Sequence, residues 1–183
     1  YNETIIMPRA NETLYLDSLN SLIKRYNIDI VIPTSEAEIG FLSSNNIDNS
    51  NRSIFVMANK LAIEIGLDKY KTMSFLSEKG IRTPWTLKAE DHLPKEFPCI
   101  LKNRFSQGSK NISIVSSESK CKFSDDMLKD SIWQQKLSPN NKEYTCCIFN
   151  SNDSGFRTLI MNRTLTNGDT SSAKIVKNPE IHQ

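Results

Sequence analysis

The stretch Phe97-Pro-Cys-Ile-Leu-Lys102-Asn-Arg-Phe-Ser-Gln-Gly108-Ser-Lys-Asn-Ile-Ser-Ile-Val115 reads as a strand, a loop and a second strand. Its apolar run ends at Lys102, and residues 112–114 alternate between apolar and polar side chains, as in a half-buried strand. Small residues and cations share the loop between them, where main-chain N–H groups can approach a ligand closely. The loop is therefore a candidate phosphate cradle, without the spacing of a Walker motif. Taken alone, it is better explained as a polar hairpin whose lysine points into water.

The composition gives no sign of a nucleic-acid or membrane partner. The chain has 183 residues, 38% of them hydrophobic, and a formal net charge of +2 with lysines spread along its length. No apolar run approaches the length of a membrane-spanning helix, and no signal peptide is visible. This length suits one compact domain or two small ones. The chain opens at Tyr1 almost on an apolar run, which suggests a fragment of a longer protein.

The cysteines predict a reducing compartment, and so a cytoplasmic protein. They are Cys99, Cys121, Cys146 and Cys147. None forms a C-x-x-C pair, so we expect free, mostly buried thiols. A zinc site is not expected, because the only histidines, His92 and His182, lack ligand spacing.

The first part of the chain predicts alternating strands and helices. Residues 5–8 are a strand candidate, Asn11 can cap the next helix, and Glu12 suits its first turn. The apolar face of that helix is expected to bury Tyr15, Leu19, Leu22 and Tyr26. A second strand over residues 28–32 completes a predicted parallel βαβ unit.

Polar residues follow this second strand. Thr34, Ser35 and Glu36 lie where a parallel sheet presents ligands, outside the carboxyl end of a strand. The simpler interpretation, which we prefer, is that Ser35 caps a helix over residues 36–42. A further strand is expected over 54–57.

Two short helices come next, the first over residues 58–66. The second has Asp68 as its N-cap and places Lys69 and Lys71 in its first turn. Cations oppose the helix dipole there unless an anion lies nearby, and helix N-termini attract phosphate. Gly80 is expected to end this helix, since Pro84 prevents its continuation. The second half predicts mainly antiparallel strands, at 85–87, 99–102, 112–114, 131–137, 143–149, 156–161 and 172–176, with a short helix after Ser124.

Five features of the sequence now occur in a fixed order. They are Leu67-Asp-Lys69, Gly80-Ile-Arg-Thr-Pro84, Phe97-Pro-Cys-Ile-Leu-Lys102 with its small-residue loop, Trp133-Gln-Gln-Lys-Leu137, and Glu143-Tyr-Thr145. This order resembles the ATP-grasp superfamily, in particular the carboxylate–amine ligases that are similar to the large subunit of carbamoyl phosphate synthetase. The resemblance runs from near Ile5 to the end of the chain. It implies an α/β plus α+β fold, with a Rossmann-like pre-ATP-grasp domain over 1–66, incomplete at its start. The antiparallel β-rich part of an ATP-grasp domain then covers 67–183, incomplete at its C-terminal end.

The resemblance also implies a nucleotide site. Lys69 would lie near the phosphates, Lys102 would bridge adenine and phosphates, and Glu143 would accept hydrogen bonds from the ribose hydroxyls. The loop that closes over the triphosphate would consist of Ser106, Gln107, Gly108, Ser109 and Lys110. The hinge whose main chain pairs with adenine would consist of Gln134, Gln135, Lys136 and Leu137.

The implied function is the ATP-binding portion of a ligase that joins a small-molecule carboxylate to an amine or ammonia through an acyl phosphate. ATP and Mg²⁺ would be its cofactors, with the magnesium ligands downstream of this chain, so no catalytic or metal residue is assigned. The fragment is expected to be inactive alone.

The sequence also departs from the family pattern. Asn103 replaces a proline, only Gly108 remains of several loop glycines, and Gln135 replaces a glutamate. An alternative is therefore a degenerate nucleotide-binding or interaction module without catalysis, and an unrelated α/β protein is a third. Lys69 and Lys71 would then belong to a solvated helix face, the interpretation we prefer for Lys71 in any case. Glu143 would be a plain cross-strand partner for a lysine.

Overall fold

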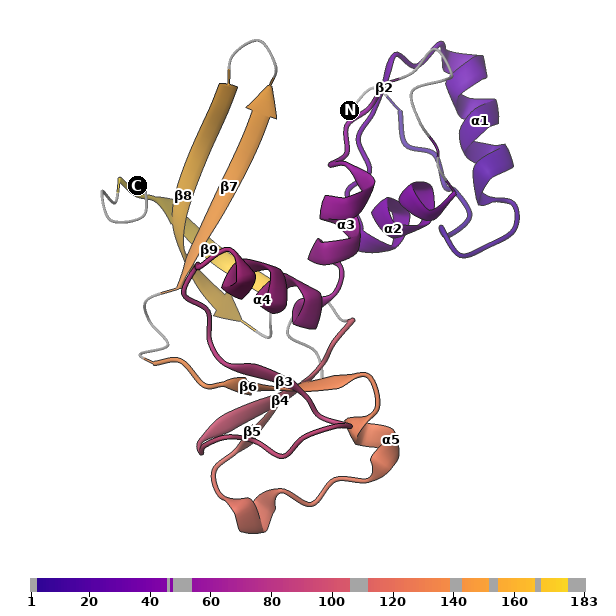
Figure 1. Cartoon of the computed structure of the whole chain (residues 1–183). Coiled ribbons are helices and arrows are strands. Elements are labelled where there is room, and N and C mark those ends of the chain that lie inside the picture. The colour runs from indigo at the N-terminus through magenta and orange to yellow at the C-terminus, as the bar shows by residue number, and fades with distance from the viewer. Residues whose placement is uncertain are drawn as a thin grey trace. The chain divides into compact units, whose positions relative to one another are not determined.

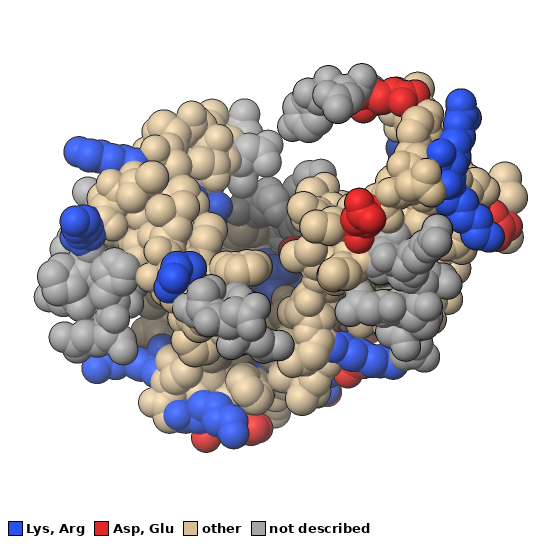
Figure 2. Space-filling view, turned by 90° about the horizontal axis from the view of Figure 1, so that it is seen from above, with Lys and Arg blue, Asp and Glu red and all other residues tan. Residues whose placement is uncertain are grey.

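The computed structural model describes residues 3–45, 47, 54–105, 112–138, 143–151, 155–166 and 169–177. The chain divides into two compact units, Tyr1–Ile81 and Arg82–Gln183. In the described ranges, no helix combines the length and the apolar character needed to cross a membrane. Lys and Arg side chains are dispersed among uncharged residues on the face shown in Figure 2.

The first unit contains short helices (Figure 1) and a two-stranded parallel sheet. Its elements are α1 (Tyr15–Tyr26), β1 (Ile30–Val31), α2 (Glu36–Ser44), β2 (Ile54–Phe55), α3 (Lys60–Gly66) and α4 (Lys69–Glu78). Ile30 lies opposite Ile54 in the parallel pair, so β1, α2 and β2 form a βαβ unit. The predicted parallel connection therefore exists, one helix later in the chain than expected.

The predicted first strand was wrong. Residues 5–8 form no strand, and Ile6 is 97% exposed. No strand in the described ranges lies beside this run, and a strand needs such a partner for its main-chain hydrogen bonds. Helix α1 also begins later than expected, with Leu14 rather than Asn11 at its N-cap and no side-chain cap.

The buried face of α1 differs from the prediction as well. It consists of Tyr15, Leu19 and Ile23, a strict four-residue repeat. Tyr26 instead lies at the surface, where its hydroxyl donates to Glu3 Oε1 at 2.9 Å. Tyrosine has an apolar ring and a polar hydroxyl, so it can lie at the surface even where the helical periodicity predicts a buried residue.

The other helix ends follow the local signals in the sequence. Ser35 caps α2 by accepting from Glu38 N at 3.2 Å, as the simpler interpretation held. Asp68 caps α4 by accepting from the main-chain N–H groups of Tyr70 and Lys71. Gly80 follows α4 with a φ of 74°, and Ile81 N donates to Leu76 O at 2.9 Å, which closes the helix.

The second unit contains two antiparallel sheets (Figure 1). The four-stranded sheet has the order β3-β6-β4-β5, with β3 (Thr86–Lys88), β4 (Cys99–Asn103), β5 (Ser113–Val115) and β6 (Ser131–Gln135). The three-stranded sheet has β7 (Tyr144–Ser151), β8 (Gly155–Thr166) and β9 (Asp169–Ile175). A short 3₁₀ turn, η1 (Glu118–Lys120), and helix α5 (Asp125–Leu128) connect β5 to β6. The mixed fold with antiparallel strands in the second half is thus confirmed.

Trp133 lies at the centre of the core beneath the four-stranded sheet. It is 1% exposed and packs with Ala89, Cys99, Leu101 and Val115. Its ring meets Phe123 edge to face, with centroids 5.7 Å apart.

The cysteines are all free, as expected, but they are not mostly buried. Cys99 is buried and Cys121 half-buried, and burial raises the pKa of both thiols. Cys146 and Cys147 are exposed on β7. The strand pattern around them is apolar, but most described side chains of β7 are exposed. Ile160 of β8, which pairs with Cys146, is buried.

Candidate functional site

Strand β4 separates a core face from a face that carries Lys102. Cys99 and Leu101 point into the core, so Ile100 and Lys102 lie on the opposite face. The register pairs Lys102 with Ile132 of β6 and Ile100 with Gln134. Directly paired residues of an antiparallel sheet share a face, so Gln134 is a diagonal neighbour of Lys102 there.

Gln134 is buried and fixed across the sheet. It is 8% exposed, and its Nε2 donates to Thr86 Oγ1 on β3 at 2.9 Å. Thr86 Oγ1 in turn donates to Pro84 O at 3.1 Å. This chain of hydrogen bonds locks the side chain of a predicted hinge residue in one orientation.

In the predicted hinge, only Lys136 and Leu137 have main-chain N–H and C=O groups that make no hydrogen bond to other described residues. Gln134 and Gln135 lie in β6, the second strand of the order β3-β6-β4-β5, where they pair with both neighbours, and Gln135 N donates to Trp85 O at 3.0 Å. The Gln135 side chain bonds to Glu96 at 3.3 Å. Lys136 and Leu137 lie just beyond the strand, and among the described residues their main chain makes no hydrogen bond. They are therefore the residues that could pair with a heterocyclic base.

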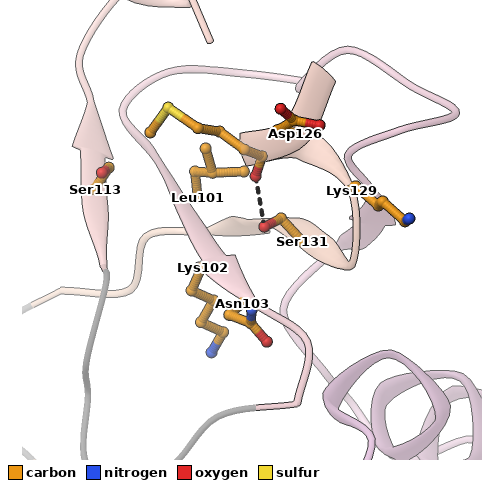
Figure 3. Close-up of a pocket in the computed structure, with 8 residues that line it drawn as sticks. Leu101, Lys102, Asn103, Ser113, Asp126, Lys129 and Ser131 are labelled. Carbon is orange, nitrogen blue, oxygen red and sulfur yellow. Dashed lines mark hydrogen bonds between the residues drawn. The ribbon is translucent and has the colours of Figure 1, made fainter. Parts of the chain in front are cut away.

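A cavity of about 320 Å³ opens beside the carboxyl end of β4. Residues from three strands and from the region of α5 line it: Leu101, Lys102, Asn103, Ser113, Asp126, Met127, Lys129 and Ser131. Figure 3 shows Lys102 and Asn103 beside each other at the strand end, and the Ser131 hydroxyl donating to Met127 O at 2.8 Å. Two lysines, one aspartate, one asparagine and two serines thus line the space together with two apolar side chains, so it could take a polar group.

The start of the β4–β5 loop is held to the sheet. Asn103 Oδ1 accepts from Phe105 N at 2.8 Å, and Arg104 N donates to Asp130 O at 2.8 Å. Asp130 adopts a φ of 52°, which turns the chain into β6. The predicted loop residues Ser106, Gln107, Gly108, Ser109 and Lys110 lie outside the described residues.

Lys69 belongs to the first unit, at the first turn of α4. Burial lowers the pKa of its ammonium group, and the negative charges of Glu36 and Asp68 oppose that shift. Asp68 is 3% exposed and forms the cap of the same helix. Lys71, in contrast, is exposed, as its interpretation as a solvated residue requires.

Glu143 directly precedes β7 and forms an ion pair across the sheet with Arg163 of β8, at 2.8 Å. The alternative interpretation of Glu143 expected a lysine as its cross-strand partner, whereas the partner is Arg163. Asn162, whose Nδ2 donates to Glu143 O at 3.2 Å, was also missed. The alternation of β8 could have suggested which residues share a face, but not which one lies opposite Glu143.

The described residues do not supply a metal site. No group of three or more His, Cys, Asp or Glu side chains in the described ranges could hold a metal ion. Magnesium prefers carboxylate oxygens as ligands. The described residues do not bring enough Asp and Glu side chains together to fit it.

Comparison with known families identifies the larger, later part of the chain. The model of the ATP-grasp domain matches residues 67–177, which include every residue predicted to contact a nucleotide. A carbamoyl-phosphate synthase from Methanobrevibacter smithii is 27% identical over 125 residues, which cover 63% of this chain and 33% of that protein. The coenzyme gamma-F420-2:alpha-L-glutamate ligase of Methanococcus maripaludis is 33% identical over 79 residues, or 38% of this chain and 27% of that protein. The chain therefore spans about a third or less of the length of these curated relatives.

The fold is also found in a solved ligase structure. The L-amino acid ligase from Bacillus licheniformis aligns with a TM-score of 0.62 at 13% sequence identity. The alignment covers 97% of this chain and 45% of that one. At this identity the likeness concerns the fold alone.

Proposed function

Because this chain belongs to the ATP-grasp family, we propose that it forms the ATP-binding portion of a ligase that joins a carboxylate to an amine or ammonia. The position of Lys102 carries the proposal. It lies at a strand end beside a cavity that a second lysine, Lys129, also lines, and on the same sheet face as the buried Gln134. Residues 1–66 would form the pre-ATP-grasp domain, with the ATP-grasp domain beginning at residue 67, and the setting would be cytoplasmic.

In the proposed reaction, ATP activates the carboxylate. A carboxylate oxygen of the substrate attacks the γ-phosphorus of ATP, ADP leaves, and an acyl phosphate forms. The amine nitrogen then attacks the acyl carbon and expels phosphate, so that a C–N bond replaces the acyl–phosphate bond. The names of the two relatives, a carbamoyl-phosphate synthase and a glutamate ligase, agree with a carboxylate-activating reaction.

The residues of this chain would bind and orient the nucleotide. The ammonium groups of Lys102 and Lys69 would offset phosphate charge, as cations do in other phosphoryl-transfer sites. Lys136 and Leu137 would pair with the adenine edge, and Glu143 would accept hydrogen bonds from the ribose. Residues 106–110 would cover the phosphates. Mg²⁺ is expected to accompany ATP with ligands outside the described residues, and no step is assigned to it here.

The proposal is tested by ATP binding to the full-length protein, measured as a thermal shift and by calorimetry. A ligand that binds only the folded state adds about 2.7 kcal/mol at a hundred times its Kd. We expect Lys102→Ala to weaken binding by roughly tenfold or more, since it removes a charge-assisted contact. Lys88→Ala is the matched control, because Lys88 also lies opposite Ile132 on this face but pairs with Asp91 at 3.6 Å.

The second candidate, a binding module without catalysis, rests on the single glycine of the loop. It predicts that the protein binds ATP, with loss in Lys102→Ala, but consumes no ATP with any carboxylate and amine. Absence of ATP binding in the full-length protein would contradict both candidates.

A further inference from the structure

Two adjacent residues of β8 hold Glu143 in place. Arg163 donates from both Nε and Nη2 to the same carboxylate oxygen, Oε1, at 3.1 and 2.8 Å. The main-chain oxygen of Glu143 accepts from Arg163 N at 3.1 Å and from Asn162 Nδ2 at 3.2 Å. Both the backbone and the side chain of Glu143 are therefore fixed by one short segment of the neighbouring strand.

This geometry leaves the second carboxylate oxygen for a ligand. Among the described residues Oε2 of Glu143 accepts no hydrogen bond, and the side chain is 41% exposed. A carboxylate oxygen has two lone pairs, so Oε2 can accept from two neighbouring hydroxyl groups. The guanidinium of Arg163 also offsets the charge of the carboxylate, which would otherwise repel a polyphosphate.

The exposure of the pair argues against a mainly stabilising role. With Arg163 32% and Glu143 41% exposed, solvent screens the attraction, and such pairs contribute little to stability. The register of the strands is held by the main-chain bond between the same two residues, which does not need the guanidinium. Loss of the guanidinium should therefore change the orientation of the carboxylate more than the fold.

We propose that Arg163, supported by Asn162, is a positioning residue that aims the free oxygen of Glu143 at the ribose hydroxyls. The site then prefers a ribonucleotide to its 2′-deoxy analogue. This inference rests on the proposed function, because it assigns the nucleotide site to which Glu143 belongs. Without Arg163 the carboxylate can rotate, and its hydrogen bonds to the ribose of ATP are weakened. The affinity for 2′-deoxy-ATP should fall less, because this nucleotide lacks the 2′-hydroxyl and makes fewer of these bonds.

The test measures the dissociation constants of ATP and 2′-deoxy-ATP for the full-length protein by calorimetry. The wild type should prefer ATP by roughly tenfold or more, as expected for a hydroxyl that meets a built acceptor. Arg163→Met should bring this preference close to one, mainly by weakening ATP, and Arg163→Lys should retain part of it. Glu143→Gln should also lower it, and combining it with Arg163→Met should add little. Arg157→Met, on the same strand and face, should leave the preference unchanged.

The outcomes separate this inference from the proposed function. A folded Arg163→Met protein with the wild-type preference would overturn the inference, while ATP binding that depends on Lys102 would leave the proposed function standing. If circular dichroism shows that Arg163→Met does not fold, Arg163→Lys and Glu143→Gln decide in the same way. A wild-type protein that binds neither nucleotide would overturn both.

Discussion

Trp133 Nε1 donates a hydrogen bond of 2.9 Å to the carbonyl of His92, 41 residues earlier in the chain. The bond ties the buried indole on β6 to the segment between β3 and β4. It satisfies the one polar group of the largest fully buried side chain among the described residues. The four-stranded sheet is therefore joined to its first connection by a side chain that also fills its core.

We expect Trp133→Phe to lower the free energy of unfolding by about 1–3 kcal/mol, because it shrinks the core and leaves the carbonyl without its donor. Trp133→Ala should cost about 3–5 kcal/mol. Urea titration followed by circular dichroism measures both. Trp85→Phe is the control, since Trp85 is only partly buried and bonds to Glu96 at the surface. Equal losses at the two tryptophans would mean that the His92 bond and the core position of Trp133 do not matter.

The hydroxyl of Tyr15 should make the stability of the first unit depend on alkaline pH. Tyr15 donates to Glu38 Oε1 at 3.0 Å, and burial, followed by this bond and the charge of Glu38, raises the pKa of Tyr15 from 10.0 to about 12. The folded state therefore keeps its proton to higher pH than the unfolded state. The resulting stabilisation is complete below pH 10 and is lost between about pH 10 and 12, on the order of 2 kcal/mol.

Tyr15→Phe should abolish that part of the pH dependence and cost about 1 kcal/mol at neutral pH for the lost hydrogen bond. Urea titrations at several pH values between 8 and 12 give the difference between the two proteins. Tyr144→Phe is the control, because Tyr144 lies at the start of β7 in the second unit. If the free energies of unfolding of the wild type and Tyr15→Phe fell in parallel above pH 10, the ionisation of Tyr15 would not cause this pH dependence.

Alanine substitutions at Gly80 and Gly66 test the effect of backbone conformation on stability, because neither added methyl group would clash. A Cβ at either position would meet no atom within 4 Å, but Gly80 has a φ of 74° and Gly66 ends a helix without a positive φ. Gly80→Ala should therefore cost about 1–2 kcal/mol, the penalty of a left-handed alanine. Gly66→Ala should be neutral or stabilise by up to about 1 kcal/mol. Chemical denaturation of the two variants in parallel measures this, and a stabilising Gly80→Ala would contradict the cap assignment.

Local signals predicted much of this fold from the sequence. The cap at Asp68, the stop at Gly80 and the apolar strand that carries Lys102 near its end each depend on a few neighbouring residues. Such features follow from hydrogen-bonding groups and periodicity within one element. They were therefore visible without knowledge of any partner strand.

The features that depend on distant partners were not predictable in this way. The apolar run over 5–8 looked like a strand, but no strand of the described residues pairs with it. The partnership of Glu143 with Arg163 requires the register between β7 and β8, and these residues are 20 positions apart. The hydrogen bond from Gln135 N to Trp85 O can be predicted only when the strand order of the sheet is known. Register and strand order are properties of the whole unit, which one segment does not encode.

Lys69 and Lys71 offer a final test of the proposed nucleotide site. We expect Lys69→Gln to weaken ATP binding by roughly tenfold, because it removes a partly desolvated cation, whose contacts with phosphate are screened less than those of a surface lysine. Lys71→Gln should have little effect, since Lys71 is exposed.

Burial lowers the pKa of Lys69, so its charge is lost earlier than that of an ordinary lysine as the pH rises. ATP affinity should therefore fall in alkaline solution in the wild type and persist in Lys69→Arg, whose guanidinium stays charged. Calorimetry from pH 7 to 10 measures these affinities, and equal binding by the wild type and Lys69→Gln would remove Lys69 from the site.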